Sequence, residues 1–507
     1  MSVAGGGLLW LWAPPPLPAT VPATFALEFY LGGSWRDFSS RLMGFESAWG
    51  REDEFSGVQP AVLRLLLDDD DGVLDPQWTA GPWYGQLDLN TPVRLSATRD
   101  GLRYPLGYGY LTDFTPQPTT LGANLQLTAT DEFQHLTGKQ ITGSFAAELE
   151  SARIHWLLAN VPFSGVEDFS PGLLPLPGIT LTDTALTTHL DQVLQASLGL
   201  FWFGPDGRAV YRNRQQRMAS ASVAHFGAGG DYPVREVHPF YNRAGLVNQA
   251  RMTRGGGAGG VNAVQQITVA TSPPAGWVWL SFRGATTVTL PSYATVAAVL
   301  AALQALPTIG AGNITCSGGP WPGQPINVTF VGTLAQQAVP LLSATTTLPA
   351  GSVTVTELTA GAVPLLQVND TASQAKYGVE TYVGSDDLSA LLPSDAERTS
   401  WLTWLVAQHA TPQTRASELL VDPYLHTGLW ARALGSDLGT RITVTHDLPG
   451  SRGIVDVDYY VEGITHRAVL AGTPDYSVTW RLSRGSYVAY WWLDRQVQLG
   501  VETRLSY

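Results

Sequence analysis

Reactive and metal-binding side chains are scarce in this chain. Its 507 residues include a single cysteine, Cys316, which excludes an internal disulfide and a cysteine-based zinc cluster. The nine histidines are scattered singly, and the sequence has no H-E-x-x-H, no G-x-S-x-G and no phosphate-binding loop that ends in Gly-Lys. We therefore expect no catalytic residues, no cofactor and no metal site, and predict that the protein is not an enzyme.

Charge and long apolar runs are also in short supply. Charged residues make up 14% of the chain, and 42 acidic against 29 basic residues give a net charge of −13, which argues against a surface that neutralises nucleic-acid phosphates. A surface so poor in charge, on a chain with 17 tryptophans, is typical of coverage by other subunits; burial inside large β domains is an equally good alternative. No apolar run approaches the roughly 18 residues that cross a bilayer, so we expect no membrane anchoring.

Alternation of apolar and polar residues is what the sequence does contain, and it predicts a mainly β fold with α+β parts. We expect an N-terminal arm (1–23), a first β domain (24–131), a small α+β domain (132–214), a second β domain in two pieces (215–256 and 363–484), an inserted α+β module (257–362) and a C-terminal tail (485–507). In the arm, Leu8–Trp12 is cut short by Pro14–Pro16, which favours an extended segment packed on a neighbour over an unstructured tail.

Outside the inserted module, the spacing of apolar residues predicts which segments are strands and which are helices. Apolar residues recur at helical spacing in Ala146–Asn160 and in a run that starts at Thr182 or Thr184 and stops at Gly199, and the capping box Ser394–Glu397 starts another helix. Expected strands are Ala26–Tyr30, Pro60–Leu67, Pro92–Thr98, Gly107–Phe114, Ser417–Val421, Arg441–His446, Val455–Ile464 and Tyr476–Leu482, with a hairpin formed by Leu200–Phe203 and Arg208–Arg212.

The module interrupts two segments that read as halves of one domain, Tyr241–Arg254 and Val368–Tyr382. Gly255-Gly256-Gly257 lies at its N-terminal side, where exposed backbone tolerates insertion. We expect strands at Val264–Val269, Trp277–Phe282, Thr286–Leu290, Asn313–Cys316 and Ile326–Phe330, and a helix capped by Ser292 with Val296, Val299, Leu300, Leu303 and Leu306 on one face. Such a sheet packed on one helix is large enough to fold alone.

Few residues invite a site hypothesis. The acidic run Asp68–Asp71 with Asp75 resembles part of a calcium loop, but Thr79 stands where the bidentate glutamate belongs, so a solvated turn is favoured by roughly four to one. His155, His189 and His409 fall on expected helices, where a structural role is favoured over that of a ligand or base. Trp277 and Trp279 share one strand face, as in a sugar-stacking platform, although such a pair far more often packs on the helix of its domain.

Several short motifs occur in a recognisable order. They are Trp35-Arg36-Asp37, Trp49-Gly50-Arg51, Leu65–Pro76, Tyr104–Asp113, Asp370–Gly378 and Val461–His466 followed by Trp480. In this order and spacing the chain resembles the minor tail proteins, or baseplate (tail-tip) hub proteins, of long-tailed phages, over most of residues 25–250 and 365–485. The inserted segment is similar to a virion-associated module of phages that infect high-GC hosts, which fits the use of two lysines, Lys139 and Lys376.

The resemblance implies a siphophage tail-tip hub in the virion, assembled in the host cytoplasm. In that family two tube-like β-barrel domains per chain form a homotrimer, a pseudo-sixfold ring that joins the tail tube to the tip and lines the channel for DNA ejection. Implied partners are further copies of the chain, the distal tail protein, other baseplate proteins and the tape measure protein, with DNA passing without specific binding. A faint echo between Tyr108–Ala129 and Val461–Trp480 is compatible with two such domains. The alternative is a carbohydrate-binding adhesin for host attachment that acts through the inserted module; a cell-wall hydrolase ranks below both.

Overall fold

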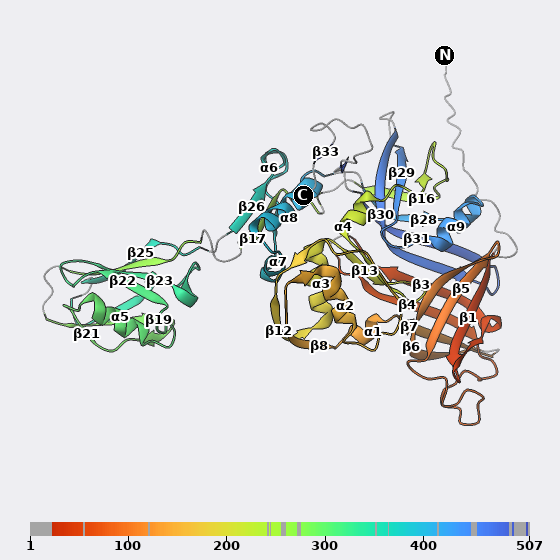
Figure 1. Ribbon diagram of the computed structural model, residues 1–507, viewed down its shortest axis with the longest axis horizontal. Helices are drawn as coiled ribbons and strands as arrows, with labels where there is room; N and C mark the ends of the chain where they lie inside the picture. The colour runs from red at the N-terminus through yellow and green to blue at the C-terminus, as the bar shows by residue number, and fades with distance from the viewer. Residues whose placement is uncertain are drawn as a thin grey trace, which may run out of the picture. The chain divides into compact units, whose positions relative to one another are not determined.

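The computed structural model describes residues 23–53, 56–119, 122–240, 243, 245–254, 260–270, 275–349, 352–362, 365–412, 415–447, 454–485, 489–490 and 503–504 (Figure 1). The expected N-terminal arm lies outside these residues. Of the expected C-terminal tail they include only residue 485 and two short strands that pair in parallel, β32 (Ala489–Tyr490) and β33 (Thr503–Arg504). The chain divides into two compact units: Met1–Ala244 with Pro412–Tyr507, called here the body, and Gly245–Thr411, called here the side unit.

One large sheet organises the body. Both expected β domains contribute to it, because β3 pairs antiparallel with β30 from Gly44 opposite Val469 to Gly50 opposite Gly463. The strand order is β16 (Glu236–Phe240), β28 (Arg415–Val421), β31 (Asp475–Arg484), β30 (Ile454–Val469), β3 (Leu42–Gly50), β4 (Gln59–Asp68), β7 (Gly122–Thr130), β6 (Leu102–Thr119), β5 (Pro92–Arg99), β1 (Thr24–Leu31) and β2 (Ser34–Asp37), with β29 (Arg441–Asp447) on β30 and β15 (His225–Phe226) on β29.

Alternating side chains give this sheet a single core. In β1, Phe25, Leu27, Phe29 and Leu31 are buried while the residues between them are more exposed. Buried residues from both halves of the chain belong to the same hydrophobic cluster, up to Trp480 and Leu482 of β31. The predicted mainly β fold is confirmed. The strand order ends at β2 and β16, and none of the sheets formed by the described residues closes on itself, so the tube-like barrels remain a prediction.

The two segments of the faint internal echo are both long antiparallel hairpins. The β6–β7 pair shifts register between Leu111 and Asp113, and the β30–β31 pair shifts between Val461 and Gly463. Each shift marks a β-bulge or a similar irregularity, a feature that bends a strand and increases its twist. The first part of β6 pairs with β5 and its second part with β7. In the same way, the first part of β30 pairs with β29 and its second part with β3. The two halves therefore build their long strands in the same way.

Small helices and strands follow β7 in the body. They are α1 (Phe133–Leu136), β8 (Gln140–Phe145), β9 (Glu148–Leu149), α2 (Glu150–Leu158), β10 (Glu167–Phe169), β11 (Pro175–Leu176), β12 (Ile179–Ala185), α3 (Leu186–Ser197), β13 (Leu200–Phe203), β14 (Ala209–Arg212) and α4 (Arg214–Ala219). The β13–β14 hairpin is confirmed. The predicted helix start at Thr182 or Thr184 is wrong, because these residues belong to β12, which pairs with β8. The helix then ends on Leu198, whose φ of 55° takes the left-handed position expected of glycine.

The side unit contains a small sheet and three helices outside the insert. The sheet has the order β26 (Leu365–Asn369), β17 (Gln249–Thr253), β27 (Thr381–Val383), and the helices are α6 (Thr371–Tyr377), α7 (Asp386–Leu391) and α8 (Asp395–His409). The capping-box prediction holds for α8, since Ser394 Oγ accepts the Glu397 N–H at 3.2 Å. Trp401, Leu402 and Leu405 form its buried face.

The insert, residues 260–362, is built from two four-stranded sheets and one helix. The first sheet has the order β22 (Ile314–Gly318), β23 (Ile326–Phe330), β18 (Val264–Val269), β25 (Val353–Thr359); the second places β19 (Trp277–Phe282) beside β20 (Ala285–Thr286), β21 (Leu290–Pro291) and β24 (Ser343–Thr346). Helix α5 (Val296–Gln304) is capped by Thr295, so the predicted Ser292 cap is wrong. The expected strand Thr286–Leu290 is broken into β20 and β21. The insert has its own core, which includes Phe282, Trp321 and Phe330.

The insert occupies the loop of a β-hairpin. Strands β17 and β26 pair antiparallel up to Thr253 opposite Leu365, and the insert begins and ends close to each other at the bridge between Val261 and Ala362. A chain in which residues 255–363 are replaced by Asn-Gly is therefore expected to keep its stability within about 1 kcal/mol, because a short turn closes the same hairpin. Chemical denaturation followed by circular dichroism measures this. Residues 260–362 expressed alone should also unfold cooperatively; an aggregated deletion chain would contradict the prediction.

Candidate functional site: a buried joint and a polar groove

A fully buried carboxylate joins three distant parts of the body. Glu462 of β30 is 0% exposed, and its Oε2 accepts a hydrogen bond from Arg51 Nε at 2.7 Å. Its Oε1 accepts from Arg217 Nη2 of α4 at 2.8 Å and also from the hydroxyl of Ser483 in β31. We call Arg51, Glu462 and Arg217 the joint. It connects two of the motif segments, Trp49-Gly50-Arg51 and Val461–His466, which lie more than 400 residues apart in sequence.

At Gly50 the backbone of the joint has room only for glycine. Arg51 donates its N–H to the carbonyl of Glu462 at 2.8 Å, so the two strands approach closely here. Gly50 has a φ of 105°, and a Cβ built on it would lie 2.3 Å from the Glu462 carbonyl oxygen. A Cβ on Gly463 would lie 2.3 Å from Arg481 Nε. Gly50 thus allows the backbone contact that brings the charges together, whereas a side chain at Gly463 would meet the movable guanidinium end of Arg481.

The charge state of the joint follows from its surroundings. Burial by itself raises the pKa of Glu462, but the guanidinium groups of Arg51 and Arg217 and the hydrogen bond from Ser483 outweigh it and lower the pKa to about 2. The carboxylate therefore stays ionised at neutral pH, where it cannot donate a proton as a general acid. Its role is to hold two arginines, and through them three segments of chain, in one geometry.

A column of stacked rings lies beside the joint. Trp49 stacks on His466 with ring centroids 5.1 Å apart, and Tyr476 stacks on Trp430 at 5.4 Å. His466 Nδ1 and the Tyr476 hydroxyl are 2.6 Å apart. Burial lowers the pKa of His466 to about 3, so this imidazole is neutral at physiological pH. The column is apolar packing with one internal hydrogen bond, as expected of a structural element.

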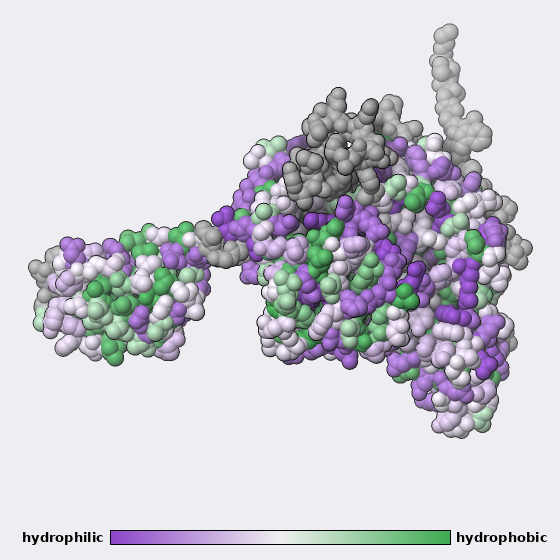
Figure 2. Space-filling model, viewed as in Figure 1, coloured by the Kyte–Doolittle hydropathy of each residue, from purple (hydrophilic) through white to green (hydrophobic). Residues whose placement is uncertain are grey.

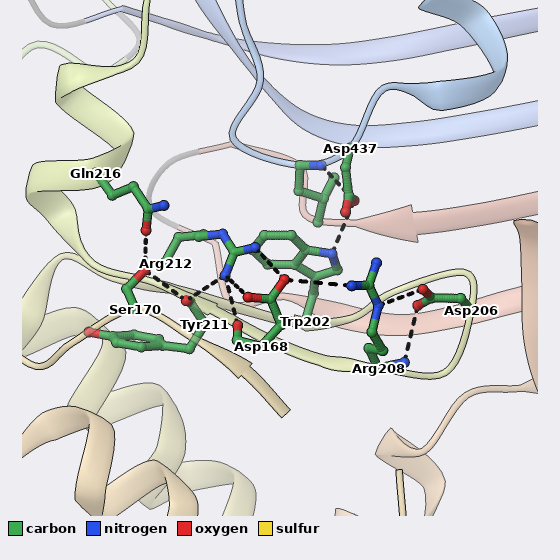
Figure 3. Close-up of polar contacts among 10 residues, drawn as sticks. Asp168, Ser170, Trp202, Asp206, Arg208, Tyr211, Arg212, Gln216 and Asp437 are labelled. Atoms are coloured by element: carbon green, nitrogen blue, oxygen red, sulfur yellow. Dashed lines mark hydrogen bonds and ion pairs between the residues drawn. The ribbon is translucent and has the colours of Figure 1, made fainter. Parts of the chain in front are cut away.

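A polar groove opens on the small α+β part of the body (Figure 3). It has a volume of about 380 Å³ and is lined by residues of β10, β14 and the start of α4, among them Asp168, Ser170, Arg212 and Gln216. The Arg212 guanidinium donates two hydrogen bonds to the Asp168 carboxylate, from Nη1 to Oδ1 at 3.0 Å and from Nη2 to Oδ2 at 2.7 Å. Behind them the Trp202 indole donates to Asp437 Oδ1 at 3.1 Å.

The groove residues are engaged with one another, which limits their chemistry. The side-chain hydrogen bond from Arg212 lowers the pKa of Asp168, so this carboxylate is a poor proton acceptor. The Ser170 hydroxyl contacts the Tyr211 carbonyl at 3.1 Å and the Gln216 amide oxygen, and no histidine lines the groove to activate it. These residues can recognise a partner by hydrogen bonds, but they do not form a nucleophile and base.

The acidic and histidine residues considered as site candidates lie apart from one another, in a turn and on three different helices. Asp71 is paired with Arg41 at 2.6 Å, and Asp69 and Asp70 accept the backbone N–H groups of Leu74 and Ala123 at 3.0 and 2.7 Å. The acidic run is thus a turn held by its own carboxylates, and no group of three or more potential metal ligands occurs among the described residues. His155, His189 and His409 lie on α2, α3 and α8 as predicted; His155 is paired with Glu167 at 2.7 Å and the other two are buried.

Two further candidates lie in the insert. Cys316 is partly buried on β22, and burial raises the pKa of its thiol to about 11, so the thiol stays protonated. Trp277 and Trp279 share a strand face as predicted, and Trp277 is 49% exposed, so about half of its surface is open to solvent. The buried face of β19 is formed by Val278, Leu280 and Phe282 instead.

Sequence reasoning missed the charges of the joint. The sequence around Glu462 does contain a sign of a buried, paired carboxylate, because Glu462 is a single acid between Val461 and Gly463 in an otherwise apolar stretch of strand. Arg217 carries none, since it stands in a polar run with Arg214 on α4. No helix among the described residues is long and apolar enough to span a membrane.

Comparisons with known proteins return tail proteins. No family model and no curated protein matches the sequence. Among solved structures, the 43 kDa tail protein of prophage MuSo2 from Shewanella oneidensis is 11% identical, with 91% of this chain and 98% of that chain covered at a TM-score of 0.49. A tail protein from Neisseria meningitidis is 9% identical (91% and 96% covered, TM-score 0.49), and a prophage tail protein from Listeria monocytogenes is 8% identical (91% and 95%, 0.44). All three TM-scores lie below 0.5, and we therefore base the proposed function on the residues of this chain.

Proposed function

We propose that this chain is a structural hub protein of a phage tail tip, without catalytic activity. The observation that carries the proposal is the joint, where Arg51 and Glu462 bind two of the motif segments that resemble tail-tip hub proteins into one sheet. Those motifs thus stand at the place where the two halves of the body are fixed to each other. A structural protein requires a rigid connection between its two halves, and it does not require a reactive group.

Assembly into a ring follows from the edges of the sheet. In the described part of the chain, β2 and β16 stand at the two ends of the strand order. An unpaired edge presents N–H and C=O groups that can pair with another chain. Three copies joined in this way, each with two wall pieces that carry long bulged hairpins, give a ring with sixfold pseudosymmetry. We assign the first β domain, 24–131, to one wall piece. The strands of the second β domain (215–256 and 363–484) that lie in the body, β16 and β28 to β31, form the other.

The surroundings of such a hub are those implied by the resemblance. It joins the sixfold tail tube to the tip in the virion, next to the distal tail protein and the tape measure protein. The net charge of −13 suits a channel through which DNA passes without adhering, because like charges repel within a Debye length. The polar groove of the body fits this non-catalytic role, since its hydrogen-bonding groups can receive a segment of a neighbouring protein.

The oligomeric state tests the hub directly. Mass photometry of the purified chain is expected to show a trimer, about three times the 54.4 kDa of one chain, and electron micrographs should show threefold density around a central hole. An obligate interface of this kind buries about 2,000 Å² or more, so the trimer should survive dilution to nanomolar concentration. A monomer at all concentrations, with no ring in micrographs of particles that carry it, contradicts the proposal.

A further inference from the structure

One face of the insert carries two tryptophans among hydroxyl groups: Trp277 is exposed and Trp279 is half-buried. In β19, Val278, Leu280 and Phe282 point into the core, so Trp277, Trp279 and Ser281 lie on the opposite face. The residues in register beside them are Pro291 of β21 opposite Trp277, and Thr345 of β24 opposite Trp279. Because directly opposite residues of an antiparallel pair share a face, the tryptophans are flanked by small polar or apolar neighbours. We call this surface the tryptophan face.

Hydrogen bonds hold the Trp279 ring and the Trp277 backbone in place. The Trp279 indole N–H donates to Thr289 Oγ1 at 3.2 Å, which fixes the orientation of the ring. The backbone of Trp277 is clamped on both sides: its N–H donates to Thr347 Oγ1 at 3.0 Å and its carbonyl accepts from Thr346 Oγ1 at 2.8 Å. A surface that is already ordered loses little conformational entropy when a ligand lies on it.

The insert is almost free of charge, which restricts what it can bind. Between residues 261 and 362 the sequence has only two residues that are charged at neutral pH, Arg283 and Glu357. Figure 2 accordingly shows the visible face of the insert as mostly pale or green. Neither ion pairing nor long-range steering can supply affinity here, so polyanions such as nucleic acids are poor ligands. A neutral ligand that offers C–H groups to the rings and hydroxyls to the threonines fits the chemistry of the face.

We propose that the tryptophan face binds a neutral polysaccharide. The flat C–H face of a sugar ring carries partial positive charge and stacks on the negative face of an indole, while its rim hydroxyls exchange hydrogen bonds with groups such as Ser281 and Thr345. Trp277 and Trp279 are two residues apart on a strand, about 7 Å, so they can serve neighbouring sugar units of one chain. This inference is independent of the hub: the face would bind whether or not three copies form a ring.

Affinity electrophoresis of the full chain tests the proposal. Gels containing dextran, mannan, galactan or arabinan are compared with a gel containing polygalacturonate, a polyanion. At least one neutral polymer is expected to retard the chain, equally at low and high salt, since no charge takes part. Trp277→Ala and Trp279→Ala should each raise the dissociation constant about tenfold, as expected for the loss of one stacking ring.

Matched variants keep this test sharp. Leu358→Ala removes a side chain of similar exposure, 51%, from β25 in the other sheet and should leave retardation unchanged. Trp279→Phe keeps an aromatic ring without the hydrogen bond to Thr289 and should bind with intermediate affinity. It replaces Trp279→Ala in the test where the alanine variant does not fold. The proposal is overturned if none of the neutral polymers retards the wild-type chain, if polygalacturonate is the preferred ligand, or if both alanine variants bind as the wild type does. It is also overturned if the variants change only the oligomeric state, which would make the face a protein contact.

Discussion

Glu462→Gln is expected to lower the free energy of unfolding of the body by about 3–5 kcal/mol. The substitution keeps the shape of the side chain but leaves Arg51 and Arg217 buried beside a neutral amide. Removing one partner of a buried charge cluster is costly because the desolvated charges left behind lose their compensation. Chemical denaturation followed by tryptophan fluorescence measures the difference.

Glu46→Gln is the matched control for this substitution. Glu46 of β3 pairs with Arg64 of β4 at 2.6 Å, but the two side chains are 37% and 53% exposed. Solvent screens such a pair, so the same chemical change should cost less than about 1 kcal/mol. Equal effects of the two substitutions would show that the joint contributes no more than a surface ion pair, and the account of the body as two halves locked at Glu462 would be wrong.

The contribution of Glu462 should also fade in acid. Its pKa in the folded chain is about 2, below the value of 4.5 expected in the unfolded chain. A depressed pKa means that the stabilisation is fully present above about pH 4.5 and is lost as the pH falls towards 2. The stability difference between the wild type and Glu462→Gln should therefore shrink over this interval, as measured by denaturation at a series of pH values.

Gly50→Ala is expected to destabilise the body by about 2–6 kcal/mol, because backbone strain and overpacking add at this position. The φ of 105° is unfavourable for any side chain, and the new Cβ would meet the Glu462 carbonyl oxygen at 2.3 Å and Leu438 Cδ2 at 2.9 Å. Backbone atoms of a central strand cannot move aside without breaking the pairing of β3 with β30. The midpoint of thermal unfolding provides the measurement.

Gly101→Ala separates the two causes. Gly101 has a φ of 77°, but a Cβ built there meets no atom within 4 Å. Its substitution should cost only the left-handed backbone strain, about 1–2 kcal/mol. If Gly50→Ala proved no worse than Gly101→Ala, close approach of the two motif segments would not be what requires glycine in Trp49-Gly50-Arg51.

Strands with regular alternation were predictable, and strands without it were not. Val264–Val269 is a strand with the predicted bounds, because its buried and half-buried residues alternate strictly. Strand β3 was missed because its burial alternates only from Phe45 to Trp49, and because Gly44 and Gly50 weaken the strand signal at its two ends. At Thr182–Ala185 the pairing with β8 overrides the helical spacing that follows.

The joint was beyond sequence reasoning for a different reason. The motif segments around Arg51 and Glu462 could be recognised one by one, but neither contains a signal for its partner. Their contact depends on β3 and β30 lying side by side, a pairing between strands from opposite ends of the chain. Only the fold decides which of the arginines reaches the buried carboxylate. The tryptophan face was closer to prediction, since strand alternation alone placed both rings on one side.

The position of the insert inside the β17–β26 hairpin has a consequence for the history of the protein. Because the module enters and leaves through neighbouring backbone positions, recombination can exchange it for another domain as one cassette while the surrounding sheet keeps its pairing. Related proteins can then differ in this module while the surrounding sheet keeps its residues. Variation among relatives should accordingly be concentrated between residues 260 and 362, and constraint should be greatest around Gly50 and Glu462.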